Sequence, residues 1–151
     1  MTEAFGKKYI LNFMKKNNLA VLSTVGSDGL ADSAPIYFTI HDNFDLYFIT
    51  PVQTNKYLNL TKKKDVVISL TNETNRETVQ FRDIAFEDSG MVPSILAELS
   101  IKLNQNNNFI SSLPLMLHHN QAKAAIKVKP YKVRLRKYFE DHFVEEIIEF
   151  N

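Results

Sequence analysis

Three consecutive residues, Thr54, Asn55 and Lys56, carry side chains that together could hold an anionic group. They follow a strand-like segment that ends at Thr50, and Thr54 is a residue type that caps helix N-termini. Free backbone N–H groups at a helix start attract anions, so a bound phosphate would offset the repulsion between Lys56 and the helix dipole. Spacing alone favours the plainer alternative, a capped surface helix with a solvated lysine.

Two further segments carry groups that suit a planar heterocycle. Gln80 lies on a strand-like segment, and its amide can both donate and accept a hydrogen bond. Pro35 lacks a backbone N–H, which predicts a strand at a sheet edge, where free main-chain groups could contact a ligand. Each segment also has a plainer interpretation, a half-exposed strand residue for Gln80 and an ordinary edge strand for Pro35.

Taken in order along the chain, these segments resemble the flavin-binding split-barrel family typified by pyridoxamine 5′-phosphate oxidase. The resemblance covers approximately residues 20–138, and it lies in the ordered set of motifs because no single motif is specific. The matching motifs are Ser23-Thr24, Asp28-Gly29, Ser33–Ile36, Leu46–Thr50, Thr54–Leu60, Val66–Leu70 and Glu77–Gln80.

The resemblance implies an FMN site at the interface of a homodimer. Position by position, it assigns Thr54, Asn55 and Lys56 to the FMN phosphate and Gln80 to the polar edge of the isoalloxazine ring. A flavin carries out hydride or electron transfer itself, so no acid–base pair or nucleophile is required, and the sequence shows none. The main chain assigned to the border of the ring is that of Pro35, Ile36, Tyr37, Ile49 and Thr50.

The sequence also departs from the family pattern in ways that bear on function. Asp32 and its neighbours replace the basic residue that is common early on the second strand, which leaves Lys56 nearly alone as a phosphate-binding cation. Arg82 could supply the missing charge if no bulge separates it from the face of Gln80. The C-terminal Arg-x-His substrate motif of the true oxidase is absent, so we do not predict vitamin B6 oxidation.

Composition excludes several other classes of protein. The 151 residues are 44% apolar and 23% charged, which is typical of one soluble globular domain. The absence of cysteine rules out disulfides and thiolate metal sites, and it fits the reducing cytoplasm, where we expect the protein. Four glycines cannot form a dinucleotide fingerprint or a Walker loop. No apolar run approaches the ~20 residues needed to cross a bilayer, and no signal peptide is recognisable.

Periodicity predicts the elements that would position these residues. Seven strands with flanking helices predict a mainly β, α+β fold, a small split β-barrel of six or seven antiparallel strands. We expect a single FMN-binding domain over residues 1–151, with a helical insert at about 90–120 and a bulge near Pro130. Helical spacing covers Glu3–Asn17, Thr54–Lys64, Val92–Leu103 and Phe109–Met116, and the strand-like segments are Leu19–Val25, Ile36–Ile40, Phe44–Thr50, Val66–Thr71, Glu77–Glu87, Ala122–Tyr138 and His142–Phe150.

The C-terminal charges and the histidines favour plain interpretations. A basic segment, Lys127–Lys137, precedes an acidic one, Glu140–Glu149, and ion pairs across a hairpin would account for both. Nucleic-acid binding is therefore the minor alternative, in keeping with a net charge of +1. The adjacent pair His118-His119 points in two directions on a helix, so we predict no metal site.

The leading prediction is a homodimeric, FMN-binding oxidoreductase that acts on an unidentified small molecule or electron donor without a membrane. The alternative is a non-catalytic flavin- or ligand-binding protein of the stress type with the same fold. Haem or a deazaflavin in place of FMN stays open as a second alternative.

Overall fold

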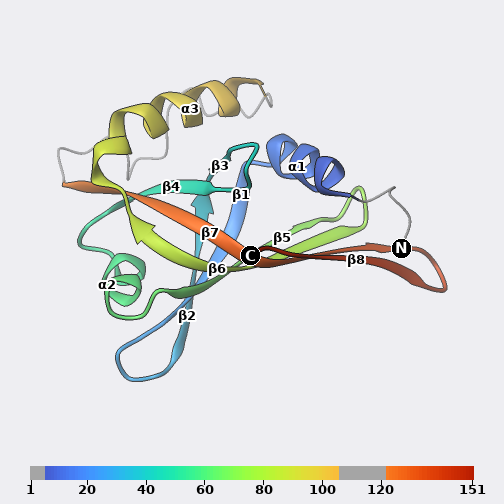
Figure 1. Cartoon of the computed structure of the whole chain (residues 1–151), viewed down its shortest axis with the longest axis horizontal. Coiled ribbons are helices and arrows are strands. Elements are labelled where there is room, and N and C mark those ends of the chain that lie inside the picture. The colour runs from blue at the N-terminus through green and yellow to red at the C-terminus, as the bar shows by residue number, and fades with distance from the viewer. Residues whose placement is uncertain (1–5, 106–121) are drawn as a thin grey trace.

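The computed structural model describes residues 6–105 and 122–151, which form one curled antiparallel sheet of eight strands with helices around it (Figure 1). The predicted helical piece Phe109–Met116 and the pair His118-His119 lie outside the described residues. The helices are α1 (Lys7–Lys16), α2 (Asn55–Lys62), the 3-10 turn η2 (Ser89–Met91) and α3 (Val92–Gln105). The strands are β1 (Leu19–Val25), β2 (Ala31–Tyr37), β3 (Thr39–Ile40), β4 (Leu46–Pro51), β5 (Asp65–Asn72), β6 (Glu77–Glu87), β7 (Lys123–Tyr138) and β8 (Phe143–Glu149).

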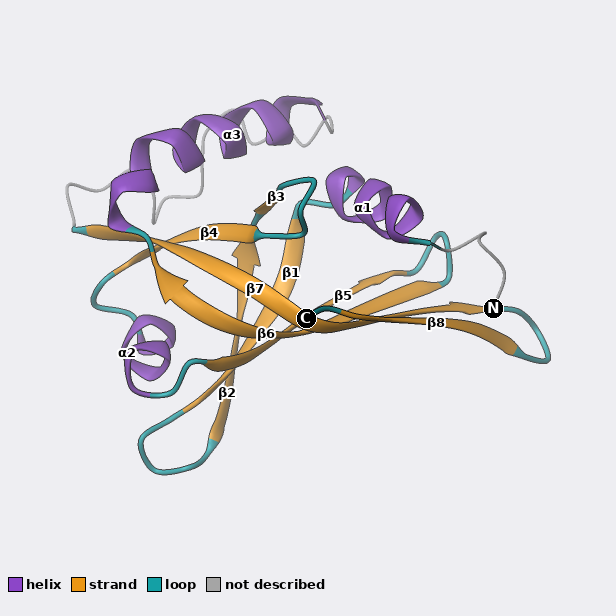
Figure 2. Cartoon of the chain, viewed as in Figure 1, coloured by secondary structure: helices purple, strands orange, loops and turns teal. Residues whose placement is uncertain are grey.

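The order of the strands makes the sheet a split barrel. It runs β2-β1-β5-β6-β7-β4-β3, and β8 adds to the second half of β7. β2 and β3 stand at opposite ends of this order but are separated in the chain by Phe38 alone, so the sheet curls until its ends meet (Figure 2). The predicted fold class is confirmed. The eighth strand arises because the second predicted strand is divided at Phe38.

The hydrophobic core fills the inside of the curled sheet. Residues along β1 alternate between exposed and buried, and Phe38, Phe48 and Phe81 in the interior are fully buried. Helix α1 adds Ile10 and Met14 to this core and ends at Lys16, with Asn17 as its C-cap. The outer face of β1, β2, β5 and β6 is only partly covered, so it is available for contacts outside the chain.

A β-bulge lets the long strand β7 keep its apolar residues inside on both halves. Register shifts between Arg82 and Asp83 of β6, where Lys132 and Pro130 are the partners and Tyr131 is left without one. The bulge lies next to Pro130, where the change of apolar phase predicts it. Because it follows Arg82, that residue stays on the same face of β6 as Gln80.

Helix α3, in the predicted insert, covers the outer face of β4. Its Ile95 and Leu99 pack with Tyr47 and Ile49 in a second apolar cluster outside the barrel. Both faces of β4 are therefore covered, and all six of its residues are buried. Within residues 6–105 and 122–151, no helix combines the length and the apolar character that a membrane crossing requires.

Candidate functional site

Strands β2 and β4 each leave one backbone edge unpaired where the barrel splits (Figure 1). β3 pairs with β4 in a register that joins Thr39 to Tyr47, and the same register continued would join Tyr37 to Ile49. The ladder ends at Thr39, however, because β2 pairs with β1 instead. The two main-chain segments assigned to the flavin ring, residues 35–37 and 49–50, are thus the two edges that border the split.

The hydrogen-bonding pattern identifies the backbone groups that face the split. Phe38 donates its N–H to the residue before β1 at 3.2 Å, so odd-numbered residues of β2 turn their main-chain groups away from β1. Val52 likewise donates to residue 122 at 3.1 Å, which turns the main chain of Ile49 away from β7. Tyr37 and Ile49 therefore present N–H and C=O groups to the split, whereas Pro35 presents only a carbonyl.

The side chains along these edges are held by packing. Tyr37 and Ile49 contact the apolar cluster under α3, and Ile36 is buried in the barrel core. The main chain of Ile36 bonds to β1, and that of Thr50 bonds to β7, by the alternation just described. Packing and pairing therefore hold both edges in place, and their free main-chain groups are what a ligand in the split would meet.

A pair of hydroxyl groups joins the end of β4 to the start of α2. The hydroxyl oxygens of Thr50 and Thr54 lie 2.8 Å apart, and both reach the carbonyl of the last β4 residue, at 3.1 and 3.0 Å. Thr54 also accepts the N–H of Tyr57 at 3.3 Å, which makes it the predicted N-cap. Because the cap occupies this hydroxyl, an anion here would meet the backbone N–H groups of Asn55 and Lys56.

Lys56 lies half-buried in the first turn of α2. Burial lowers the pKa of its ammonium from the ordinary lysine value, and none of the described residues forms an ion pair with it. The helix dipole also disfavours a cation at this end. A partly desolvated charge without a counter-ion gains from binding an anion, which would satisfy the ammonium and the helix start together.

Asn55 faces a different electrostatic environment. Its side chain lines a hollow at the tip of the β1–β2 hairpin, together with the carboxylates of Asp28 and Asp32. Asp28 accepts the N–H of Leu30 at 3.0 Å, and Asp32 accepts the N–H of Ser33 at 2.9 Å. Asp32, which stands where the family commonly has a basic residue, thus lines the same hollow as Asn55, one of the predicted phosphate ligands.

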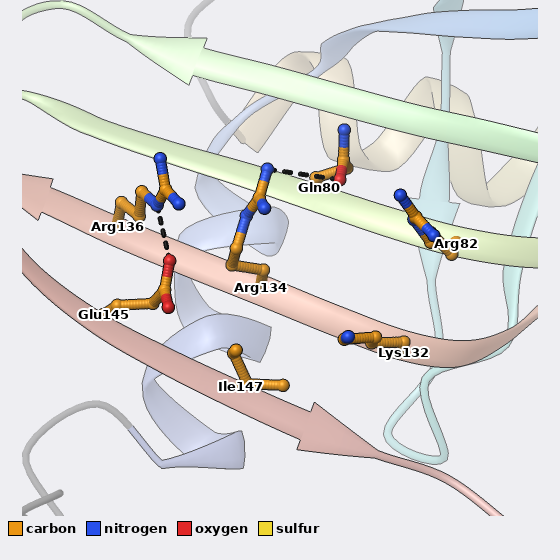
Figure 3. A pocket seen from close by; sticks show the side chains of 7 residues that line it. All are labelled: Gln80, Arg82, Lys132, Arg134, Arg136, Glu145 and Ile147. Carbon is orange, nitrogen blue, oxygen red and sulfur yellow. Dashed lines mark hydrogen bonds and ion pairs between the residues drawn. The ribbon is translucent and has the colours of Figure 1, made fainter.

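Gln80 lies apart from the split in the single chain. It is on the outer face of β6, three strands from β2, which is about 14 Å at the usual strand spacing. From β4 it is two strands away, and its partner on β7, Arg134, lies beyond the segment 123–128 that pairs with β4. Its side-chain oxygen accepts a hydrogen bond from Arg134 at 3.3 Å, and Arg82 lines the same pocket (Figure 3). Of the nine predicted residues, five lie on the edges of the split and three at the start of α2, the two regions being joined by the Thr50–Thr54 contact, and Gln80 lies outside both.

Sequence reasoning missed one residue beside the split, Lys102 of α3. Its ammonium is buried, donates to the carbonyl of Phe38 at 2.9 Å and lies 3.6 Å from the centre of that ring. Burial lowers its pKa to about 7. The signal was its position in the apolar stripe of the helix, three residues after Leu99, where a lysine must be buried.

No group of three His, Asp or Glu side chains in the described ranges, 6–105 and 122–151, is placed to hold a metal ion. His41 instead bonds to Glu98 at 2.8 Å, and His142 bonds to Asp141 at 2.6 Å.

Comparison with known proteins identifies the fold. No family model matches the sequence, and no curated protein matches it. Solved structures do match over nearly the whole chain. General Stress Protein 26 from Bacillus anthracis str. Sterne is 20% identical, with a TM-score of 0.66, and the match covers 97% of this chain and 99% of that one.

Two further structures extend the comparison. A pyridoxamine 5′-phosphate oxidase-related, FMN-binding protein from Nostoc punctiforme PCC 73102 is 13% identical, with a TM-score of 0.65 and coverage of 99% and 100%. An F420 reductase is 16% identical, with a TM-score of 0.65 and coverage of 81% and 93%. The chain therefore has the split-barrel fold of the pyridoxamine 5′-phosphate oxidase-like proteins, as the order of its motifs predicts.

Proposed function

We propose that the chain binds FMN between two copies of itself and serves as an FMN-dependent oxidoreductase for a small molecule. The observation that carries this proposal is Lys56, half-buried at the start of α2 with no counter-ion among the described residues. In the proposed complex its ammonium and the N–H groups of Asn55 and Lys56 hold the FMN phosphate. FMN supplies hydride or electron transfer when bound, so the chain's own task is to bind and orient it.

The split would border the isoalloxazine ring. The N–H and C=O groups of Tyr37 and Ile49 are suited to the polar atoms of a planar heterocycle, and Pro35 adds a carbonyl. Ile36 and Thr50 support these edges because their main chains pair with β1 and β7. In this assignment Thr54 acts as the helix cap and keeps the phosphate-binding N–H groups in place.

A second copy of the chain would complete the site. Gln80 is too far across the sheet to reach a ring in its own chain's split, so in the proposed dimer the partner supplies it. Leu19 and Val21 are 52% and 42% exposed, and with Pro35 they form an apolar patch on the same outer face. Exposed apolar patches of this kind favour association with another protein surface.

The named neighbours support a flavin-type cofactor. One of them is an FMN-binding protein, and another is an F420 reductase. A deazaflavin is therefore the second occupant to test, and haem is the third, since another structure with this fold is described as a heme binding protein. The single domain over residues 1–151 and the cytoplasmic location also stay predictions.

A non-catalytic flavin- or ligand-binding protein of the stress type is the second candidate function. The carboxylates of Asp28 and Asp32 beside Asn55 favour it, because they weaken the field that would hold a phosphate. A protein of this kind would bind its ligand without turnover.

The visible spectrum of the purified protein and a titration with FMN test binding. We expect flavin absorbance bands and quenched flavin fluorescence in the parent protein. Lys56→Glu should weaken FMN binding at least about tenfold, since hydrogen bonds to a charged group contribute roughly 1.5–3 kcal/mol. Lys63→Glu, an equal charge reversal at the other end of α2, is the matched control and should keep the parent affinity.

The outcomes separate the candidates. Bleaching of the bound flavin by NADH or NADPH, followed by reoxidation, supports the oxidoreductase, whereas tight binding without bleaching by either donor supports the non-catalytic protein. Unchanged affinity in Lys56→Glu would overturn the phosphate assignment. A colourless protein that binds none of FMN, F420 and haem would overturn the cofactor proposal as a whole.

A further inference from the structure

A strongly basic pocket lies on the outer face of the sheet, over β6, β7 and β8 (Figure 3). Each strand contributes side chains to it from neighbouring register positions. Four of the lining residues are cations and one is an acid. The residues that line this basic pocket are Gln80, Arg82, Lys132, Arg134, Arg136, Glu145 and Ile147.

The cations of the basic pocket face one another across the sheet. Arg82 is the direct cross-strand partner of Lys132, and Gln80 is the partner of Arg134. Side chains at such positions have Cβ atoms about 5 Å apart, and like charges placed directly opposite destabilise a sheet. The arrangement disfavours folding in the free protein, and an anion bound between the cations would offset this cost.

Little within the described chain neutralises these charges. Arg136 pairs with Glu145 at 2.5 Å, but Arg134 faces Ile147 where the acidic strand would have to supply a carboxylate. Lys132 faces Glu149 in the register and forms no ion pair with it. The neutralisation expected across this hairpin therefore occurs at a single pair among residues 6–105 and 122–151, and three cations are left uncompensated.

The geometry of the cationic side chains indicates which kind of anion would neutralise them. Guanidinium groups present planar, forked donors that match the oxygens of phosphate and carboxylate groups. Gln80 accepts from Arg134 and so orients one of these forks, while Ile147 gives the basic pocket one apolar border. Glu145 and Glu149 flank the cations on β8, which limits the positive field to a small area.

We propose that the basic pocket is a binding site for a compact phosphate-bearing anion, held by Arg82, Lys132 and Arg134. This site is distinct from the FMN phosphate site of the same chain, which lies at the start of α2. Gln80, which the FMN proposal assigns to the ring bound by the partner copy, borders the same pocket, but the anion site rests on Arg82, Lys132 and Arg134 and does not depend on that assignment. A nucleic acid is not the favoured ligand, because the net charge is only +1 and Lys129, the next cation along the outer face of β7, pairs with Asp45 at 3.8 Å.

Calorimetric titration of the full chain with inorganic pyrophosphate tests the proposal. We expect saturable binding to the parent and at least about tenfold weaker binding to Arg82→Gln and to Lys132→Gln, because each loses a charge-assisted hydrogen bond. Lys8→Gln removes an exposed cation from α1 and is the matched control, which should bind like the parent.

Thermal melting gives a second readout that a merely structural role would not produce. Without anion, Arg82→Gln and Lys132→Gln should melt at or above the temperature of the parent, because they remove a like-charge contact. With pyrophosphate, the parent should be stabilised more than either variant. A lower melting temperature of both variants without anion, together with parent-like affinity, would contradict the proposal.

Three other results test where the anion binds and which class of ligand the basic pocket takes. Loss of pyrophosphate binding in Lys56→Glu, with parent-like binding in Arg82→Gln, would place the anion at α2 and overturn this inference while leaving the FMN proposal intact. Absence of FMN binding alongside normal pyrophosphate binding would overturn the FMN proposal alone. Tight binding of an oligonucleotide with no binding of pyrophosphate would overturn the compact-anion assignment.

Discussion

Asp83 of β6 is a carboxyl group buried inside the barrel. It is fully inaccessible, and neither of its carboxyl oxygens has a hydrogen-bond partner in the described chain. Burial raises its pKa to about 8, and the backbone of Ile68 lowers it too little to compensate. The group is therefore protonated in the folded protein at neutral pH, while the unfolded chain has already released the proton.

This difference predicts how stability depends on pH. Between about pH 4 and pH 8 the folded state binds one more proton than the unfolded state, so stability falls as pH rises, by at most about 1.4 kcal/mol per pH unit. Asp83→Asn removes this dependence. Relative to the parent, we expect it to gain stability steadily from pH 5 to pH 8, measured by urea unfolding.

The comparison between pH values makes this test specific. A buried amide carries its own penalty, which is the same at every pH, so only the change with pH reports the carboxyl group. Asp65→Asn, on the exposed first position of β5, is the control and should follow the parent profile. Parallel profiles for Asp83→Asn and the parent would refute the assignment of the proton.

At the same scale, the sequence predicted some site residues better than others. Thr54 was identified as a helix cap because capping is local, and the hydrogen bond from Tyr57 confirms it. Lys102 was missed because its role depends on Phe38, a residue 64 positions away. A charged residue within an apolar helical stripe was the only local sign of it.

At the scale of elements, the N-cap of α2 contributes both to the stability of this helix and to the proposed phosphate site. Thr54→Ala removes the cap and the contact with Thr50, so we expect a loss of about 1 kcal/mol in stability. FMN affinity should fall as well, since the first turn would fray and its N–H groups would lose their fixed directions. Chemical unfolding and an FMN titration measure the two effects.

Two further variants test whether the cap itself is responsible for these losses. Thr54→Ser keeps a hydroxyl group and should retain most of both properties. Thr61→Ala loses only an exposed hydroxyl on the same helix, which bonds to the carbonyl of Leu58, and should leave FMN affinity unchanged. Equal losses of affinity in Thr54→Ala and Thr61→Ala would show that general helix stability, not the cap, governs binding.

At the scale of elements, local periodicity predicted the bulge within β7 but not which strands pair with one another. The bulge beside Pro130 followed from the change of parity between Val128 and Val133, which needs no knowledge of a partner. The division of β2 from β3 left no such sign, because Ile36, Phe38 and Ile40 continue one alternation. The strand breaks there because its partner changes from β1 to β4, and pairing partners are set by the whole sheet.

At the scale of the molecule, Leu19, Val21 and Pro35 form an exposed apolar patch that a second copy could cover. Val21→Glu places a charge in the exposed patch on β1 without touching the core, so we expect it to convert the proposed dimer to a monomer. Because the partner would supply Gln80, FMN binding should weaken in the same variant. Size-exclusion chromatography with light scattering and an FMN titration measure the two effects.

Ile101→Glu is the matched control for this surface. Ile101 is also an exposed apolar residue, at 57%, but it lies on α3 beside Thr39 and Ile40 and is not part of the patch formed by Leu19, Val21 and Pro35. It should remain dimeric and bind FMN as the parent does. A parent protein that is monomeric at micromolar concentration and still binds FMN would remove the need for a partner.

The arrangement of the whole chain also explains the limit of the site prediction. The motif order placed Lys56 and the edges of β2 and β4 in one region, because hairpins and short loops connect them in the sequence. It could not show that β1 and β5 lie between β2 and Gln80, since that order arises only when the sheet closes. Closure of the barrel is a long-range event that no local pattern encodes.

Pro35 has a consequence for how the chain avoids self-association into fibres. An exposed strand edge is a template on which another polypeptide can add its own strand, hydrogen bond by hydrogen bond. On the open side of β2, the ring nitrogen of Pro35 offers no hydrogen in the middle of that template. A planar organic molecule can still form hydrogen bonds with the main-chain groups on either side of Pro35. The split can therefore bind a small planar ligand while it disfavours the addition of another β-strand.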